Sequence, residues 1–318
     1  MEEVQEKWIC GFWRRIGALF IDTLVLGVLG YIVGLFLEDI FVQLGGWGRL
    51  IGFAVSITYF GVMNSSLSNG QTIGKRILNI KVVDSSNSTI SLPKSFLRYS
   101  FLAVPFSLNG AQITNEALLS YLMYPLSFII FGGLFGGLFS IFYLYIFNRA
   151  TRQSLHDLAV DTYVVNTEAS PEELPPVWKP HLVVVAGLFI TAALVPVFTS
   201  DLAKSEPFKG LLATQEAINS NESVKYAGVT EGSTTFTSSD SGTVTTTYVN
   251  TQAFLYKNNV DDSDIAKQLA QVIVKTYPES LNKNLIQVTL TYGYDIGIAS
   301  KWNSYNHQFN PQELNSSE

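Results

Sequence analysis

One acidic residue lies inside a long apolar stretch near the N-terminus. Residues 11–37 read GFWRRIGALFIDTLVLGVLGYIVGLFL, which is long enough to cross a bilayer as a helix. Asp22 is the single charge inside the apolar run, and Arg15 lies seven residues before it, on the same helix face. Because ionisable groups inside a span mark ion pathways, Asp22 is a candidate proton or cation carrier. The alternative is a structural ion pair with Arg15 or with a basic residue of another span. The lack of a second carboxylate in the expected spans favours this structural pair.

A glycine-rich motif with two basic residues follows at residues 70–78, GQTIGKRIL. It is one residue short of a phosphate-binding P-loop, and Arg76 stands where a serine or threonine would hold magnesium. A nucleotide site is therefore not expected. We predict instead that the two glycines turn the chain at the membrane surface and that the two basic side chains lie at anionic lipid head groups. The site residues of this motif are Gly70, Thr72, Gly74, Lys75 and Arg76.

His156 and Asp157 form the third polar candidate. A His-Asp pair suits a proton relay or part of a metal hydrolase, but a hydrolase needs further ligands. The chain has three histidines and one cysteine, Cys10, so we expect no metal site, no cofactor and no disulfide. We find no nucleophile–base pair and expect no catalytic residues and no enzyme. The His156-Asp157 pair is predicted to cap a helix or to pair with arginines of the basic loop.

Five apolar stretches are candidates for membrane crossings: residues 16–37, 47–63, 99–113, 117–147 and 181–199. The loop at 64–98 and the segment after residue 147 are basic, which makes them cytoplasmic by the positive-inside rule. This predicts a cytoplasmic lead at 1–10 and an exported C-terminal region at 201–318. The stretch 99–113 is interrupted by a proline and is read as a short or re-entrant crossing. Without it, the run 117–147 would double back at its glycines.

Two local patterns refine this topology. The sequence RILNIKVVD inside the basic loop alternates loosely and predicts a short strand. The run 117–147 holds glycines four residues apart, a pattern that lets helices approach closely. These glycines are Gly132, Gly133, Gly136 and Gly137.

The exported region, residues 201–318, is preceded by the linker 167–180 and the last span 181–199. It has the composition of a soluble α+β domain. Helical spacing occurs at 203–220 and 262–277, and strand-like alternation occurs at 244–256 and 285–292. The Thr/Ser-rich stretch 230–242 is predicted to be a turn or flexible loop.

The overall composition agrees with this division. Charged residues make up 14% of the chain, against about 25% in soluble domains, as expected if half of the chain lies in a membrane. The net charge of −6 argues against binding to nucleic acid. The expected fold is a membrane α-helical bundle followed by a soluble α+β domain.

Three motifs together resemble the RDD family of membrane proteins, which is named for one arginine and two aspartates. They are Arg15-x-x-Ala18-x-x-x-Asp22, the segment 70–78 leading into IKVVD, and Ser154-Leu155-His156-Asp157 followed by TYVV. The resemblance covers residues 8–166 and implies a transmembrane domain at 11–166. It makes Asp157 the second aspartate, with Asp84 as a competing candidate. It also implies an undefined activity, with transport, including cation/proton exchange, as the usual suggestion.

Two functions of different class follow. The first is a membrane anchor or accessory protein that presents the exported domain to a protein or small-ligand partner. The second is a small transporter or cation/proton exchanger that uses Asp22. In both cases the expected partners are the lipid bilayer and its anionic head groups, and the expected location is the plasma membrane. The sequence leaves open whether the protein forms a homo-oligomer.

Overall fold

The computed structural model describes residues 7–108, 126–199, 201–238 and 242–315. The chain divides into two compact units. Unit 1 comprises residues 1–36, 46–198 and 296–299, and unit 2 comprises residues 37–45, 199–295 and 300–318.

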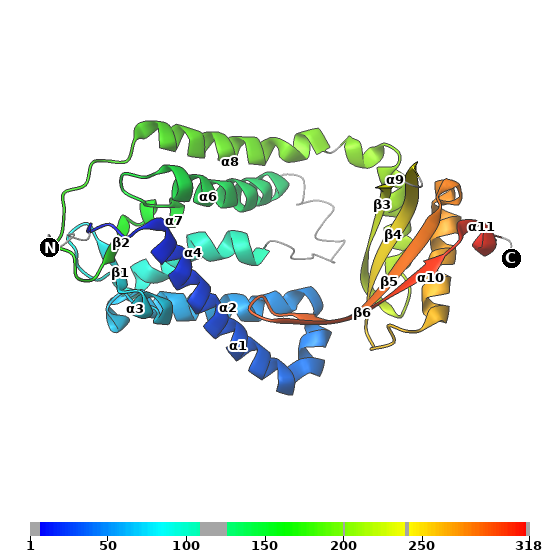
Figure 1. The fold of residues 1–318 in the computed structure, drawn as a ribbon, viewed down its shortest axis with the longest axis horizontal. Coiled ribbons are helices and arrows are strands. Elements are labelled where there is room, and N and C mark those ends of the chain that lie inside the picture. Colours follow the sequence, from blue (N-terminus) through cyan, green and yellow to red (C-terminus); the bar gives the residue numbers. More distant parts are fainter. Residues whose placement is uncertain (1–6, 109–125, 200, 239–241, 316–318) are drawn as a thin grey trace. The chain divides into compact units, whose positions relative to one another are not determined.

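Unit 1 is built from long helices and a small two-stranded sheet (Figure 1). In chain order its elements are α1 (Phe12–Leu44, which passes into unit 2 at Leu37), η1 (Gly45–Gly48), α2 (Arg49–Met63), η2 (Ser66–Ser68), α3 (Ile73–Ile77), β1 (Ile80–Asp84), α4 (Leu92–Leu108), η3 (Gly132–Gly136), α6 (Gly137–Phe147), α7 (Leu155–Leu158), β2 (Thr162–Asn166) and α8 (Lys179–Thr199).

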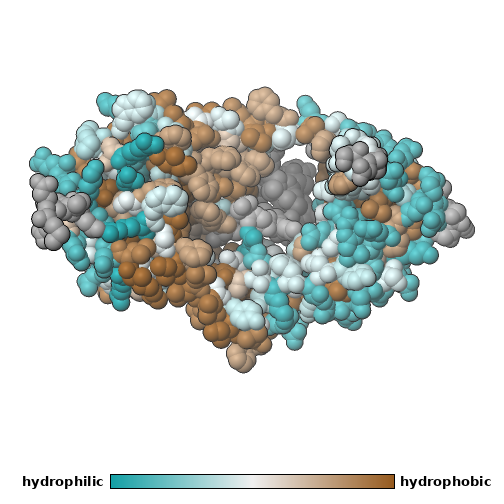
Figure 2. Space-filling model, viewed as in Figure 1, coloured by the Kyte–Doolittle hydropathy of each residue, from teal (hydrophilic) through white to brown (hydrophobic). Residues whose placement is uncertain are grey.

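Three stretches of the described chain are long and apolar enough to cross a membrane: Phe12–Met63, Leu126–Phe147 and Lys179–Thr199. Large apolar side chains on these stretches face outward; Phe20 is 63% exposed and Val183 is 72% exposed. Figure 2 shows this hydrophobic surface over the helices of unit 1. Contiguous apolar surface of this kind is expected where lipid replaces water as the solvent.

The third predicted span begins earlier than the sequence suggested. Helix α4 starts at Leu92, so Lys94 and Arg98 lie on a helix and not in the basic loop. Helix α4 begins this early because Pro93 fits the first turn of a helix, where its missing N–H is not needed. The predicted end of this span at Ile113, and the predicted start of the next at Ala117, lie outside the described residues.

Glycines bring two of the long helices close together, as predicted. A Cβ added at Gly132 would lie 3.2 Å from the Cβ of Ala193 in α8. A Cβ added at Gly136 would lie 2.8 Å from the Cα of Phe189 in the same helix. The π-helical turn Gly132–Gly136 therefore presents its small residues to α8.

Strands β1 and β2 pair antiparallel, with Val82 opposite Val164, and Ile9 bridges to Val165. The strand predicted from RILNIKVVD is confirmed as β1. Figure 1 shows β1, β2, α3 and α7 gathered at one end of the long helices. A compact apolar core lies beneath them and contains Cys10, Ala18, Ile80, Val82, Ile90 and Val164. Segments that are distant in the sequence therefore meet at this end of unit 1.

Unit 2 contains a four-stranded sheet with helices on one face. Its elements are η4 (Leu202–Lys204), α9 (Phe208–Asn219), β3 (Val224–Ser238), β4 (Gly242–Leu255), α10 (Ser263–Thr276), η5 (Pro278–Asn282), β5 (Leu285–Asp295), β6 (Ser300–Phe309) and α11 (Pro311–Asn315). The strand order is β3-β4-β5-β6; β4 and β5 run parallel, and the outer pairs run antiparallel. Helix α10 is the crossover that a parallel pair requires.

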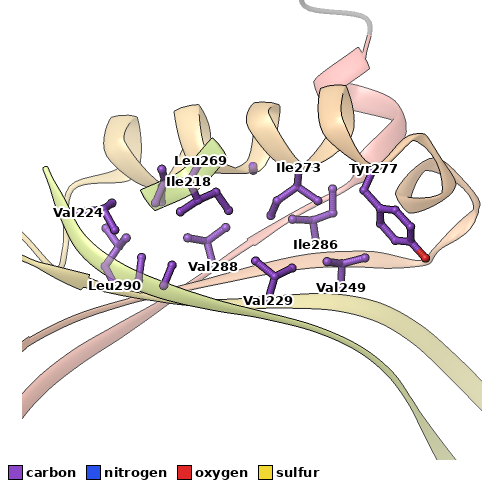
Figure 3. Packing of buried hydrophobic residues seen from close by; sticks show 14 of the residues in the cluster. Ile218, Val224, Val229, Val249, Leu269, Ile273, Tyr277, Ile286, Val288 and Leu290 are labelled. Atoms are coloured by element: carbon purple, nitrogen blue, oxygen red, sulfur yellow. The ribbon is translucent and has the colours of Figure 1, made fainter. Parts of the chain in front are cut away.

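The core of unit 2 lies between the sheet and helices α9 and α10. Figure 3 shows Leu269 and Ile273 of α10 directed toward Ile286 and Val288 of β5. All four side chains are fully buried, and Ile218 of α9 joins the same cluster. Alternation along β5 buries one face of the strand, because successive side chains point to opposite faces.

Two strands of unit 2 depart from the sequence-based expectation. The Thr/Ser-rich stretch predicted as a loop belongs largely to β3, and residues 239–241 of that stretch lie outside the described residues. Cross-strand hydroxyl bonds stabilise it: Thr235 bonds Thr245 at 3.0 Å, and Thr237 bonds Thr243 at 3.1 Å. The sequence gives no signal for strand β6, because its residues are mostly polar and its three aromatic residues do not alternate regularly.

Two short segments belong to a different unit from the chain on either side of them: residues 37–45 belong to unit 2, and residues 296–299 belong to unit 1. Within unit 2, the ring of Phe41 lies 5.3 Å from that of Tyr294. Within unit 1, the backbone of Ile296 packs against Gly52 so closely that an added Cβ would lie 2.0 Å from the Ile296 carbonyl oxygen.

Candidate functional site

Asp157 joins two arginines from different helices. Nη2 of Arg15, on α1, lies 2.5 Å from Oδ2 of Asp157, and Nη2 of Arg98, on α4, lies 2.5 Å from Oδ1. Nε of Arg98 also donates to Oδ1 at 3.1 Å. The side chains of both arginines are 6% exposed and that of Asp157 is fully buried. This three-residue ion pair therefore ties α1, α4 and α7 together inside unit 1.

Local structure holds the Asp157 carboxylate in place. Ser154 precedes α7 in a capping box, in which the Ser154 backbone N–H donates to Oδ2 of Asp157 at 3.2 Å. The Ser154 hydroxyl donates to the Ile141 carbonyl at 3.1 Å, which fixes the start of α7 against α6. Both predicted roles of Asp157, helix capping and pairing with arginine, are thus present in one side chain.

Asp22 is fully buried and accepts three hydrogen bonds from neutral groups. The Thr72 hydroxyl donates to Oδ2 at 2.6 Å, the Gly74 backbone N–H donates to Oδ1 at 2.8 Å, and the Tyr59 hydroxyl donates to Oδ1 at 2.7 Å. The expected ion pair between Arg15 and Asp22 is wrong, because Arg15 pairs with Asp157. Asp22 lies about two turns further along α1, opposite the first turn of α3, and meets those donors instead.

Gly74 and Gly70 allow this contact. A Cβ added at Gly74 would lie 2.1 Å from the Ala18 carbonyl oxygen, so glycine lets α3 lie directly on α1. Gly70 has φ +71°, and a Cβ there would lie 2.3 Å from the Val82 carbonyl oxygen. Gly70 therefore makes the turn that the sequence predicted. The small residues at these positions serve the docking of α3 and β1 on the helices.

Lys75 is half-buried in this region, and its position at anionic lipid head groups stays a prediction. Its ammonium donates to Oδ1 of Asn64 at 2.7 Å. Burial, together with the nearby charge of Arg98, lowers the pKa of Lys75 to about 7. Arg76, the next residue, stays exposed.

His156 is buried beside the ion pair, with Nε2 3.6 Å from Oδ2 of Asp157. Burial lowers the pKa of His156 to about 3, so its imidazole is neutral near pH 7. Burial alone would raise the pKa of Asp157, but the charges of Arg98 and Arg15 outweigh it and hold this pKa well below its usual range. Nδ1 of His156 is a buried atom without a hydrogen-bond partner in the described part of the chain.

Residues 9–161 match the family model described as the RDD family. The charged residues of the three motifs fall inside this match and meet around Asp22 and Asp157, while the TYVV that follows the third motif begins directly after its end. Residues 9–161 belong to the RDD family. The rest of the chain, C-terminal to this RDD domain, matches no family model.

The RDD protein is also similar to YxaI of Bacillus subtilis (strain 168), which is itself described as uncharacterized. The two are 29% identical over 111 residues, which covers 28% of this chain and 72% of YxaI. No solved structure matches. Residues 9–161 thus form an RDD-family membrane region of undefined function, and a C-terminal region follows it.

Sequence reasoning missed three members of the polar cluster in the RDD domain: Arg98, Tyr59 and Asn64. Arg98 falls in the predicted basic loop, and the signal that places it on a helix is Pro93, a typical first-turn residue. Tyr59 and Asn64 carry no charge and lie near the end of an apolar run. The sequence offers no signal that distinguishes them from ordinary interfacial residues.

A cavity of about 500 Å³ opens beside the polar cluster of the RDD domain. Its polar end is lined by Arg15, Asp22, Lys75, Arg98 and His156. The rest of the lining is mostly apolar and includes Leu19, Leu26, Phe60, Leu102, Phe106 and Phe142, with Thr23, Arg49, Ser56, Asn64 and Tyr145 as further polar members. Among the described residues, no group of three or more acidic, histidine or cysteine side chains is placed to hold a metal ion. The cavity therefore offers charge and hydrogen bonds at one end and hydrophobic contact at the other.

Proposed function

We propose that this protein is a non-enzymatic anchor or accessory protein of the plasma membrane, whose RDD domain holds the C-terminal α+β domain at the membrane surface. The observation that carries this proposal is that both buried carboxylates are held by several hydrogen-bond donors. Asp22 accepts three neutral hydrogen bonds, and Asp157 accepts two guanidinium groups and a backbone N–H. A group that binds and releases protons or cations needs free coordination positions, whereas these oxygens are committed to fixing α1, α3, α4 and α7.

The C-terminal domain supplies the surface for a partner. Helices α9 and α10 cover one face of its sheet, and the opposite face carries a groove of about 530 Å³. The groove is lined by uncharged side chains: Thr234, Thr246, Tyr248, Asn250, Gln252, Leu285, Gln287 and Thr289. Hydroxyl and amide groups in this arrangement suit a neutral, hydrogen-bonding protein or small-ligand partner.

The proposed topology places the N-terminus in the cytoplasm and the C-terminal domain outside, with five crossings. The positive charge of the segments around residues 75–98 and 149–152 supports it. Single cysteines at Thr89 and Asn259, both exposed, test it in a Cys10→Ala background. A membrane-impermeant thiol reagent should label position 259 in intact cells and position 89 only after lysis. The reverse pattern would overturn the orientation.

Proteoliposome flux tests the anchoring role. The purified full chain should show no cation/proton exchange above protein-free liposomes, because three hydrogen bonds already hold the Asp22 carboxylate. Exchange that disappears in Asp22→Asn, in a protein that still inserts and elutes as the wild type does, would reject the anchor and favour an exchanger.

The exchanger is the second candidate, and one observation favours it. Asp22 lines the cavity of the RDD domain, and Lys75, whose pKa lies at about 7, lines it too. A proton-accepting group beside a buried carboxylate in a cavity is a feature of proton-coupled carriers. The flux comparison between wild type and Asp22→Asn separates the two candidates.

A further inference from the structure

The cavity of the RDD domain has a polar end and otherwise mostly apolar walls, all formed by unit 1. Arg15, Lys75 and His156 line the polar end, while Leu102 and Phe106 of α4 belong to the apolar walls. Its volume of about 500 Å³ falls within the range of about 300–1,000 Å³ that is usual for small-molecule sites. The proposed anchoring function does not require such a cavity.

The polar end carries a surplus positive charge. The guanidiniums of Arg15 and Arg98 are matched in number by the carboxylates of Asp22 and Asp157, and His156 is neutral near pH 7. Lys75 is therefore the additional cation of this cluster. A cavity with this charge favours a ligand that brings one negative charge.

Two groups at the polar end have unused hydrogen-bonding capacity. The Lys75 ammonium has three N–H donors and one acceptor among the described residues, Oδ1 of Asn64. His156 is 5% exposed, and its Nδ1 has no partner in the described chain. A buried polar atom without a partner costs free energy, which a bound polar group would recover.

The apolar walls can be reached from the hydrocarbon side of the membrane. Phe106 of α4 is 49% exposed and Phe142 of α6 is 51% exposed, and both line the cavity. Their rings lie 6.3 Å apart, centroid to centroid, in an edge-on arrangement. An alkyl chain lying along these two rings would exchange lipid contacts for ring contacts, while its head would stay at the polar end.

We propose that this cavity binds a single-chain amphiphile with an anionic head group, with the head at Lys75 and His156 and the chain along the α4 and α6 side chains. The negative head completes the charge balance of the polar end. The chain fills the apolar volume. A free anion lacks the second interaction, and a neutral or zwitterionic amphiphile lacks the first.

Binding of matched lipids to the full-length protein in phosphatidylcholine nanodiscs tests the proposal. The probes are 12-carbon lysophosphatidylglycerol, lysophosphatidylcholine of the same chain length, and sodium phosphate. We expect saturable binding of the lysophosphatidylglycerol, with a higher thermal midpoint, and at least tenfold weaker binding of the other two. Equal affinity for the two lipids, or an equal effect of phosphate alone, would overturn the proposal.

Two variants, each with a matched control, locate the site. Lys75→Met should lower the affinity for lysophosphatidylglycerol about tenfold or more, whereas Arg76→Met, at an exposed position, should leave it unchanged. Leu102→Trp should block the apolar end, whereas Leu97→Trp, on the same helix and 52% exposed, should not. If Lys75→Met does not fold, the Leu102→Trp comparison decides. Unchanged affinity in every folded cavity variant would contradict the assignment.

Dependence on pH adds an independent readout. The charged groups around Lys75 are Arg15 and Asp22 on α1, Arg98 on α4 and Asp157 on α7, with His156 neutral beside them. The phosphodiester of the lipid keeps its charge from pH 6 to pH 9, so Lys75 is the group expected to titrate. The affinity should fall as the pH rises through about 7, and it should stay constant in Lys75→Arg. A wild-type affinity that does not change over this range would count against Lys75 as the ligand.

Discussion

Different kinds of interaction stabilise the interior of each of the two units. In unit 2, Ile218, Leu269, Ile273, Ile286 and Val288 pack an apolar core between a sheet and two helices. In the RDD domain, the helices face lipid, and buried polar groups join α1, α3, α4 and α7. Apolar burial gives little specificity in a solvent that is itself apolar. The RDD domain therefore fixes its structure with charges and hydrogen bonds, which need particular residues at particular positions.

This difference explains why one half of the chain is recognisable by motifs and the other is not. Replacing Asp157 or Gly74 breaks a contact that no other side chain makes. Replacing Ile286 with another aliphatic residue of similar size preserves its role, because cores tolerate swaps that conserve volume. The following predictions test this contrast, starting with the largest expected effect.

Asp157→Asn should destabilise the protein most, by about 3–5 kcal/mol, because two buried guanidiniums lose their counter-charge. The thermal midpoint of the full chain in detergent measures the loss. Asp161→Asn is the matched control, since Asp161 is exposed four residues later. Midpoints of the two variants that agree within error would show that the ion pair does not hold the domain together.

Leu269→Ala should cost unit 2 about 2–5 kcal/mol, because the side chain is fully buried between α10 and the sheet. The core of unit 2 lies between residues 211 and 314, so we expect the fragment 201–318 to fold alone and to melt cooperatively. Chemical denaturation of this fragment gives the free energy of unfolding. Leu212→Ala, at a 50% exposed site on α9, is the control. A fragment without a cooperative transition would contradict the independent core.

Gly74→Ala should destabilise the RDD domain by about 1–3 kcal/mol, because the new methyl group would overlap the Ala18 carbonyl and lift α3 from α1. Gly133→Ala is the matched control, since a Cβ at Gly133 meets nothing within 4 Å. The thermal midpoints of the two variants in detergent give the comparison. Equal tolerance of both substitutions would mean that the contact between α3 and α1 is dispensable.

Lys75 should make the stability of the RDD domain depend on pH. Its pKa is lowered in the folded state to about 7 from an ordinary value of 10.5, so between these values the unfolded chain binds more protons. Stability should therefore rise with pH from about 7 to about 10. The rise should be smaller in Lys75→Met than in the control Lys81→Met, as measured by thermal midpoints at several pH values. The same slope in both variants would assign the effect to other groups.

The sequence identified much of this structure, and its errors have physical causes. Helical periodicity placed Arg15 and Asp22 on one face, but periodicity does not show that Asp157 and Thr72, distant in the sequence, supply their partners. Apolar alternation identified β4 and β5. It could not identify β6, where His307 alone is buried. Thr-rich β3 forms because threonine suits a strand and pairs across it, although its sequence resembles that of a loop.

A double-mutant cycle tests the central claim, that Arg15 acts through Asp157 and that Asp22 is held separately. Arg15→Met should be combined with Asp157→Asn in one cycle and with Asp22→Asn in another, with thermal stability measured in detergent. The account predicts a coupling energy of about 1–3 kcal/mol between Arg15 and Asp157, and a value near zero between Arg15 and Asp22. Strong coupling of Arg15 to Asp22, with none to Asp157, would contradict it.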